Sequence, residues 1–250
     1  FAFYSYMKEK VTHYEQEPLV RYVASYSGGG SFAIPEPVVG KPLQYIFSYP
    51  FAGLDPQTGE PMGILDGEPS TDYSSILSQT TLEELDYYGS AIPTHFGALR
   101  NNMNWKGWDF SVNVSYRLGY YFKRETIDFA SLNRGGFQHA DYAMRWQQPG
   151  DETSTFVGSD PLVANNNRNT FEQNHSGNIR KGDHIRLQDI RLGYTFDKSR
   201  FTGLPVERVQ LYSYINNLGI LWKSAKDVSD PDFRNTQMPR TYAFGLRVDF

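Results

Sequence analysis

The sequence predicts an all-β fold, a transmembrane antiparallel β-barrel, of which residues 1–250 form a C-terminal segment with about seven strands. Three observations support this prediction. Aromatic residues make up 16% of the chain, although only 39% is hydrophobic and the mean hydropathy is -0.55. Segments of strict two-residue alternation are longer than strands of soluble proteins. Long and short connections alternate along the chain, as they do in outer-membrane barrels.

The clearest predicted strand covers residues 108–122. Its even positions are apolar from Trp108 to Phe122, and its odd positions are mainly polar. A tilted strand needs about 9–11 residues to cross a bilayer, so this segment is long enough to cross and to protrude. Alternation of this kind places apolar side chains toward lipid and polar side chains toward the barrel lumen.

A tight hairpin precedes this strand. Lys106 and Gly107 form a two-residue turn, in which glycine supplies the positive φ that such turns require. Trp105 and Trp108 then face each other across the turn, and residues 95–105 form the preceding strand. Paired tryptophans beside a tight turn are typical of the aromatic girdle at a membrane interface.

Shorter alternating patterns predict five further strands, at about 1–11, 43–52, 190–196, 209–215 and 240–250. Ile185 and Leu187 have the opposite phase to Ile190. A β-bulge near Gln188 or Asp189 would restore the phase, because a bulge adds one residue to one strand of a pair.

The connections between these strands are unequal. Residues 53–93, 123–183 and 219–239 are long, whereas 106–107 and 197–207 are short. If the C-terminus lies in the periplasm, this pattern places each of these long connections outside the cell. Residues 15–41 do not fit, because they are long and fall on the periplasmic side. Their topology stays open at this point.

Seven strands cannot close a bacterial barrel, which uses an even number of eight or more. Lipid offers no hydrogen bonds to an open sheet edge. We therefore expect the remaining barrel strands to come from a longer chain or from a second polypeptide. The run from Phe1 to Tyr6 resembles the middle of a strand, so we also expect sequence before it. Residues 1–250 are expected to belong to one barrel domain.

Composition excludes several other classes. The chain has no cysteine and a net charge of -4, which argues against a disulfide scaffold and against a nucleic-acid partner. The five histidines do not occur at metal-ligand spacing. The acidic run 227–232 could hold calcium, but Pro231 interrupts the pattern, and loop capping is the preferred interpretation. We expect no cofactor, no metal site and no catalytic site, and hence no enzyme.

Six stretches, in order, follow a known pattern: 39–59, 106–111, 144–149, 182–194, 216–218 and 239–245. Residues 182–194 match GD-x-(I/L)-RL-x-x-(I/V)-x-LGY, and Arg145, Trp146 and Pro149 match RW-x-x-P. Taken together, these stretches are spread over nearly the whole chain, from residue 39 to residue 245. The sequence thus resembles the SusC/RagA family of TonB-linked outer-membrane transporters.

This resemblance implies a 22-stranded barrel with an N-terminal plug, of which the chain would be the last third. It also implies a SusD-like surface lipoprotein as a lid and TonB as the source of energy. The substrate would be an oligosaccharide or a peptide. The location would be the outer membrane of a Gram-negative bacterium of the Bacteroidetes type.

Aromatic residues in the predicted extracellular loops are candidate contacts for substrate or for the lipoprotein lid. Sugar rings stack on such side chains, although an aromatic residue in a long loop is more often part of the packing. The candidates are Phe137, Tyr142, Trp146 and Trp222, with Arg145 beside Trp146 in the family-like stretch.

The last strand carries a second candidate signal. Apolar residues at every second position precede a terminal aromatic residue, which resembles the signal that the barrel assembly machinery recognises. The residues are Tyr242, Phe244, Leu246, Val248 and Phe250. We expect deletion of Phe250 to lower the amount of protein inserted in the outer membrane. Normal surface labelling of that variant would refute this signal.

The leading hypothesis is therefore the barrel part of a SusC-like importer. A SusC-like barrel that serves as a structural scaffold in a secretion or assembly complex is the alternative. A barrel enzyme such as a protease or lipase is a third hypothesis, which the absence of a convincing catalytic constellation disfavours.

Overall fold

The computed structural model describes residues 1–28, 34–136, 139–161, 163–234 and 236–250. The chain divides into two compact units. Unit 1 contains Phe1–Met7, Pro93–Tyr120 and Gly182–Phe250, and unit 2 contains Lys8–Ile92 and Tyr121–Lys181. Strands predominate over helices, which agrees with the predicted all-β class. Among the described residues, no helix is both long and apolar enough to span a bilayer.

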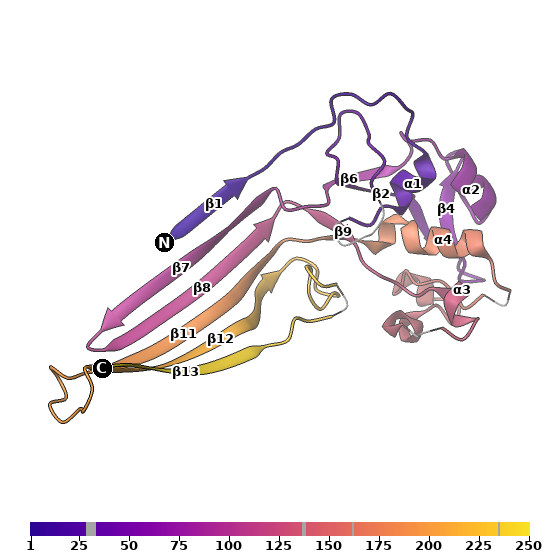
Figure 1. Cartoon of the computed structure of the whole chain (residues 1–250). Helices are drawn as coiled ribbons and strands as arrows, with labels where there is room; N and C mark the ends of the chain where they lie inside the picture. The colour runs from indigo at the N-terminus through magenta and orange to yellow at the C-terminus, as the bar shows by residue number, and fades with distance from the viewer. Residues whose placement is uncertain (29–33, 137–138, 162, 235) are drawn as a thin grey trace. The chain divides into compact units, whose positions relative to one another are not determined.

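Unit 1 is built on one antiparallel sheet with the strand order β1-β7-β8-β11-β12-β13 (Figure 1). Neighbouring strands in this sheet pair in antiparallel fashion throughout. The strands are β1 (Ala2–Tyr6), β7 (His95–Trp105), β8 (Trp108–Leu118), β11 (His184–Asp197), β12 (Arg208–Lys223) and β13 (Thr241–Asp249). Six of the seven predicted strands therefore lie in this sheet.

The hairpin between β7 and β8 has the predicted form. Lys106 and Gly107 have φ values of 47° and 91°, so both central residues of the turn are left-handed. Trp105 pairs directly with Trp108. The predicted bulge is also confirmed, because the register of β11 shifts between Leu187 and Asp189 against both of its neighbours.

One face of the sheet is apolar. Residues directly opposite each other in a ladder share a face, so the register assigns every strand position to one side. Large side chains on this face that remain exposed include Tyr4, Tyr6, Leu99, Met103, Trp105, Trp108, Leu192, Leu211, Tyr242, Phe244 and Leu246. Val248 shares the face, and Phe250 follows the end of β13. A row of large exposed apolar side chains calls for an apolar environment.

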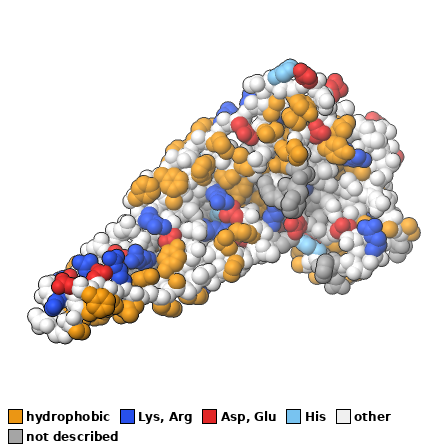
Figure 2. Space-filling model, in the orientation of Figure 1, with side chains coloured by type: hydrophobic (Ala, Val, Ile, Leu, Met, Phe, Trp, Pro, Cys, Tyr) orange, Lys and Arg blue, Asp and Glu red, His pale blue; other side chains and the backbone are white. Residues whose placement is uncertain are grey.

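The opposite face is polar and ion-paired. Arg100 binds Asp189 at 3.1 Å, and the Asn113 amide donates to the same carboxylate at 2.8 Å. Asp189 is only 3% exposed although it lies in the middle of the sheet. Arg191 lies 4.0 Å from Asp109 on this face. Near the end of the sheet that carries the C-terminus, Figure 2 shows basic and acidic side chains clustered together.

The predicted strand at 43–52 is wrong as a member of this sheet. Its residues form two short strands of unit 2, β2 (Tyr45–Ser48) and β3 (Phe51–Leu54). All four residues of β2 are buried, so the alternating aromatic residues do not mark one wet face. β2 pairs with β6 (Asp86–Ser90).

This correction also bears on residues 15–41. Among the described residues, no strand of the sheet lies between β1 and β7, so the chain from residue 7 to residue 94 is one long connection. The connections 119–183 and 224–240 are also long, whereas 106–107 and 198–207 are short. Long and short connections therefore alternate without the exception that the sequence prediction contained.

Unit 2 is formed by short elements drawn from two of these long connections. Besides β2, β3 and β6, they are α1 (Val20–Ser25), β4 (Pro61–Leu65), β5 (Glu68–Ser70), α2 (Tyr73–Gln79), β9 (Tyr121–Lys123), α3 (Phe129–Leu132), α4 (Asn166–Asn174) and β10 (Ile179–Lys181). Single turns of 3-10 helix occur at Ala140–Met144, Asp151–Thr153 and Ser176–Asn178.

A hydrophobic core holds unit 2 together. Tyr45, Tyr49 and Phe171 are fully buried in it, with Ile46 and Ile76 beside them. Burial of one large apolar side chain stabilises a fold by about 1.5–3 kcal/mol. The long connections thus contain a folded unit with its own core rather than extended loops.

Candidate ligand-binding site

The predicted contact residues fall in different places. Tyr142, Arg145 and Trp146 lie together in unit 2, at and just after the 3-10 turn Ala140–Met144. Phe137 lies outside the described residues. Trp222 belongs to unit 1. The structure therefore brings three of the five candidates into one neighbourhood.

The prediction of a loop position for Trp222 is wrong. β12 extends to Lys223, and Trp222 pairs with Ile185 of β11. A turn is indicated by the sequence Asn216-Asn217-Leu218-Gly219. In the structure, β12 continues through this segment, where its pairing with β11 is irregular and Asn217 has a φ of 59°. Trp222 is therefore an aromatic residue near the end of β12, and its side chain is about half exposed.

Arg145 and Tyr142 form a stacked pair. The Arg145 guanidinium lies 4.0 Å from the centroid of the Tyr142 ring, and its Nη1 donates to the Tyr142 carbonyl at 2.8 Å. The Tyr142 hydroxyl donates to Asp160 at 3.0 Å. The stack and the two hydrogen bonds fix the orientation of the guanidinium, which is favourable for recognition of a planar anion.

The Trp146 ring is buried and held in one orientation. It is 9% exposed, and its Nε1 donates to Glu152 at 3.3 Å. Gly59 packs against the ring with a φ of +70°, and a Cβ at that position would lie 2.3 Å from the indole. Only glycine combines this backbone angle with this close approach. Trp146 therefore shapes the site rather than presenting a free ring face.

Arg145 and Trp146 border a pocket of about 730 Å³ within unit 2. The pocket, here named the Arg145 pocket, lies between the β3–β4 connection, the start of α2, residues 145–147, residues 159–161 and the start of α4. Its lining residues are Thr58, Glu60, Thr71, Tyr73, Arg145, Trp146, Gln147, Ser159, Asp160, Pro161, Val163, Asn165 and Arg168. Its volume falls in the range of about 300–1,000 Å³ that small-molecule sites occupy. Polar and aromatic side chains share its wall.

Arg168 and Glu60 complete the wall and were not predicted from the sequence. The Arg168 Nε donates to Glu60 at 2.6 Å, and its Nη2 donates to the Ser159 carbonyl at 2.6 Å. The Tyr73 hydroxyl donates to the same Glu60 carboxylate at 2.7 Å. Asn165 caps α4 by accepting from the Asn167 and Arg168 amides. In the sequence, Asn165 before the polar run 166–170 is a signal for the start of α4, because asparagine is a preferred N-cap residue.

Glu172 lies one helical turn after Arg168 and is fully buried. Burial raises its pKa from 4.5 to about 7, against the lowering effect of the Arg168 charge. The Gly158 amide donates to Oε1 at 2.9 Å, whereas Oε2 has no hydrogen-bond partner. Below about pH 7, this carboxyl group therefore keeps its proton in the folded state.

We expect the free energy of unfolding of unit 2 to fall as pH rises from 4.5 towards 7, because the folded state retains the Glu172 proton that the unfolded state has released. Stability from a raised carboxyl pKa is present at low pH and is lost as pH passes the folded value. Hydrogen exchange of α4 measures the effect. The variant Glu172→Gln should lack this dependence, and a wild-type slope in that variant would contradict the assignment.

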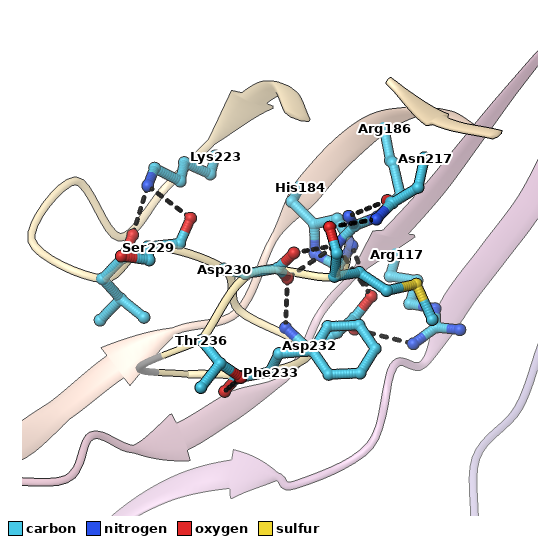
Figure 3. Close-up of polar contacts among 12 residues, drawn as sticks. Arg117, His184, Arg186, Asn217, Lys223, Ser229, Asp230, Asp232, Phe233 and Thr236 are labelled. Atoms are coloured by element: carbon cyan, nitrogen blue, oxygen red, sulfur yellow. Dashed lines mark hydrogen bonds and ion pairs between the residues drawn. The ribbon is translucent and has the colours of Figure 1, made fainter. Parts of the chain in front are cut away.

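A second polar cluster lies at the end of the sheet in unit 1 (Figure 3). Arg186 donates to both oxygens of Asp230, at 2.6 and 2.8 Å, and lies 3.3 Å from Asp232. Asp232 also binds Arg117 at 2.7 Å and lies 3.3 Å from the Nε2 of His184. Two carboxylates of the acidic run 227–232 thus bind side chains of β8 and β11. In the described part of the chain, no cluster of acidic and histidine side chains could hold a metal ion.

No protein-family model and no curated protein matches the chain. A structure of the RagAB peptide transporter matches 85% of this chain and 23% of its own, with a TM-score of 0.58 and 19% identity.

Two further structures, of the RagAB peptide importer, also match. The open-open state matches 82% of this chain and 22% of its own, with a TM-score of 0.56 and 19% identity. The closed-closed state matches 82% of this chain and 23% of its own, with a TM-score of 0.54 and 21% identity. The chain spans less than a quarter of each of these chains, and the likeness shows that it has the fold of part of a RagAB transporter chain.

Proposed function

We propose that the chain is part of the barrel of a SusC-like outer-membrane importer, with unit 1 in the barrel wall and unit 2 formed by connections on the extracellular side. The substrate is a peptide or an oligosaccharide. Both units belong to one barrel domain of a larger, 22-stranded transporter. The solved structures that match the chain belong to a peptide importer, which supports this proposal.

The two-faced sheet of unit 1 is the observation that carries the proposal. Its exposed apolar face, including Leu99 and Phe244, suits lipid. Its opposite face holds the Arg100–Asp189 ion pair and Asn113, which suit a wet lumen. In a soluble sheet with one wet face, the apolar face packs on a core instead.

The edges of the sheet support membership of a closed barrel. Among the described residues, β1 and β13 each pair with a strand on one side only. An open edge in lipid leaves peptide groups without hydrogen bonds, and each such group costs several kcal/mol. The proposal therefore includes the remaining barrel strands as partners of β1 and β13, and outer-membrane lipid as the surroundings of the apolar face.

A surface lipoprotein and TonB are the proposed protein partners. The connections that contain unit 2 all leave the same end of the sheet, at Tyr6, His95, Leu118 and His184. A folded unit formed by extracellular connections offers a surface for a lipoprotein lid of the SusD type. TonB would act through a plug that belongs to the complete transporter.

Substrate uptake by cells tests the proposed function. Cells that carry the full-length protein, its lipoprotein and an intact TonB system should accumulate labelled peptides or oligosaccharides, and cells without the protein should not. Equal accumulation in both strains, with the protein present in the outer membrane, would contradict import. That outcome would favour the alternative, a SusC-like barrel that acts as a scaffold in a secretion or assembly complex.

A further inference from the structure

We propose that the Arg145 pocket binds a carboxylate group of a peptide ligand. This inference rests on the proposed function and gives its substrate a chemical class. It is carried by the free charge of Arg145, by the start of α4 with Arg168, and by the covered faces of the aromatic side chains in the pocket.

The charge of Arg145 is not neutralised by a neighbouring acid. Its guanidinium stacks on Tyr142 and donates once, to the Tyr142 carbonyl. Among the described residues, no carboxylate lies within ion-pair distance of it. A guanidinium has five N–H donors in a planar fork that matches a carboxylate. Most N–H donors of the Arg145 guanidinium are therefore free to bind a ligand in the pocket.

The start of α4 adds positive potential to the same pocket. This helix has nine residues, and its capping residue Asn165 lines the pocket. The N-terminus of a helix carries a partial positive charge and attracts anions. Arg168 lies in the first turn with its side chain 3% exposed, and its Nη1 is buried without a hydrogen-bond partner. Glu60 neutralises one side of this guanidinium and leaves that donor unpaired.

The remaining groups favour a peptide carboxylate over other anions. Asp160 also lines the pocket, and its negative charge opposes a doubly charged phosphate more than a singly charged carboxylate. Its carboxylate can accept from a peptide N–H beside the bound carboxylate. Glu60 also lines the pocket, but its charge is paired with Arg168. The remaining charges, one arginine and one acid, are therefore suited to a peptide rather than to a phosphate ester.

Sugar rings commonly stack on an open aromatic face, and the aromatic residues that line the pocket do not offer one. The Trp146 ring is packed against Gly59 and is 9% exposed. The Tyr142 ring does not line the pocket, and the Arg145 guanidinium stacks on it. Tyr73 is 7% exposed and is bound to Glu60. Recognition in this pocket therefore depends on charge and hydrogen bonds rather than on ring stacking.

Calorimetry with matched peptides tests this proposal on the purified full-length protein. The probes are an acetylated trialanine with a free C-terminus, its C-terminal amide, and an amidated acetyl peptide with glutamate at the central position. Each acid probe that uses the pocket should bind at least about tenfold more tightly than the neutral amide. The first comparison reports a C-terminal carboxylate and the second a side-chain carboxylate. Equal binding of all three probes would overturn the proposal.

Variants assign the effect to the pocket. Arg145→Gln should abolish the preference for acid probes, and Arg145→Lys, which keeps the charge but not the fork, should retain part of it. Arg21→Gln is the matched control, because Arg21 also stacks on a tyrosine of unit 2, Tyr22, and does not line the pocket. An unchanged acid preference in Arg145→Gln, or an equal loss in the control, would overturn the assignment.

The binding and import experiments test the two proposals separately. If acid peptides bind in an Arg145-dependent way but cells do not import them, the assignment of a carboxylate site is supported and the proposed import function is contradicted. If peptides are imported while binding shows no dependence on Arg145, the pocket assignment fails alone. Tighter binding of an acidic oligosaccharide than of every acid peptide would overturn the peptide assignment.

Discussion

The substitution Leu99→Arg is expected to destabilise the protein in lipid by about 2–4 kcal/mol, the cost of an arginine on the lipid face near the middle of a barrel wall. Leu99 lies near the centre of β7 on the apolar face and is 55% exposed. In water, an arginine at such an exposed position would cost little. The measurement is unfolding by denaturant after folding into lipid vesicles.

The matched control is Asn102→Arg. Asn102 lies on the same strand, is also exposed, and faces the polar side, where Arg100 already lies. We expect this variant to unfold within about 0.5 kcal/mol of the wild type, as surface substitutions usually do. Similar free energies for the two arginine variants would contradict a lipid-facing apolar side, because both sides would then be in contact with water.

The second large effect is expected at Asp230. The substitution Asp230→Ala should destabilise unit 1 by about 3 kcal/mol, because the Arg186 guanidinium is left buried without its main partner. Arg186 and Asp230 are 5% and 2% exposed. Arg186 keeps weaker contacts with Asp232 and Asn217, which places the effect at the lower end for a broken buried pair.

Hydrogen exchange of residues 225–233 reports the loss of Asp230, since this segment is held to β11 through the Arg186 pair. Faster exchange in Asp230→Ala is the expected result. Lys226→Ala serves as the control, because Lys226 is exposed in the same segment. Unchanged exchange in Asp230→Ala would show that the segment is held by its other contacts, such as those of the buried Ala225 and Val228.

Local patterns predicted the sheet of unit 1 well. The 95–105 strand, the Lys106–Gly107 turn and the bulge beside Asp189 all depend on neighbours in sequence, through periodicity and turn chemistry. The predicted strand 108–122 extends too far, because residues 121–123 continue the alternation although β8 ends at Leu118. Gly119, with a φ of +76°, ends the strand before them.

Unit 2 was not predicted because its signals are long-range. The aromatic alternation of residues 43–52 resembles a membrane strand, but burial on both faces of β2 depends on contacts that period alone does not reveal. The Arg145 pocket shows the same limit. Arg145 and Trp146 were found from a local motif, whereas Arg168 meets Glu60 across 108 positions of the chain.

Single-cysteine labelling along β12 tests the membrane-facing sheet most directly. Residues 1–250 contain no cysteine. Spin labels can therefore be placed singly at positions 209–215 of the full-length protein in lipid, once any cysteine outside these residues is replaced by serine. We predict that labels at odd positions collide mainly with oxygen dissolved in lipid, and that labels at even positions collide mainly with a water-soluble nickel complex. Access of the nickel complex to both sets of positions would contradict the account, because no face of the sheet would then lie in lipid.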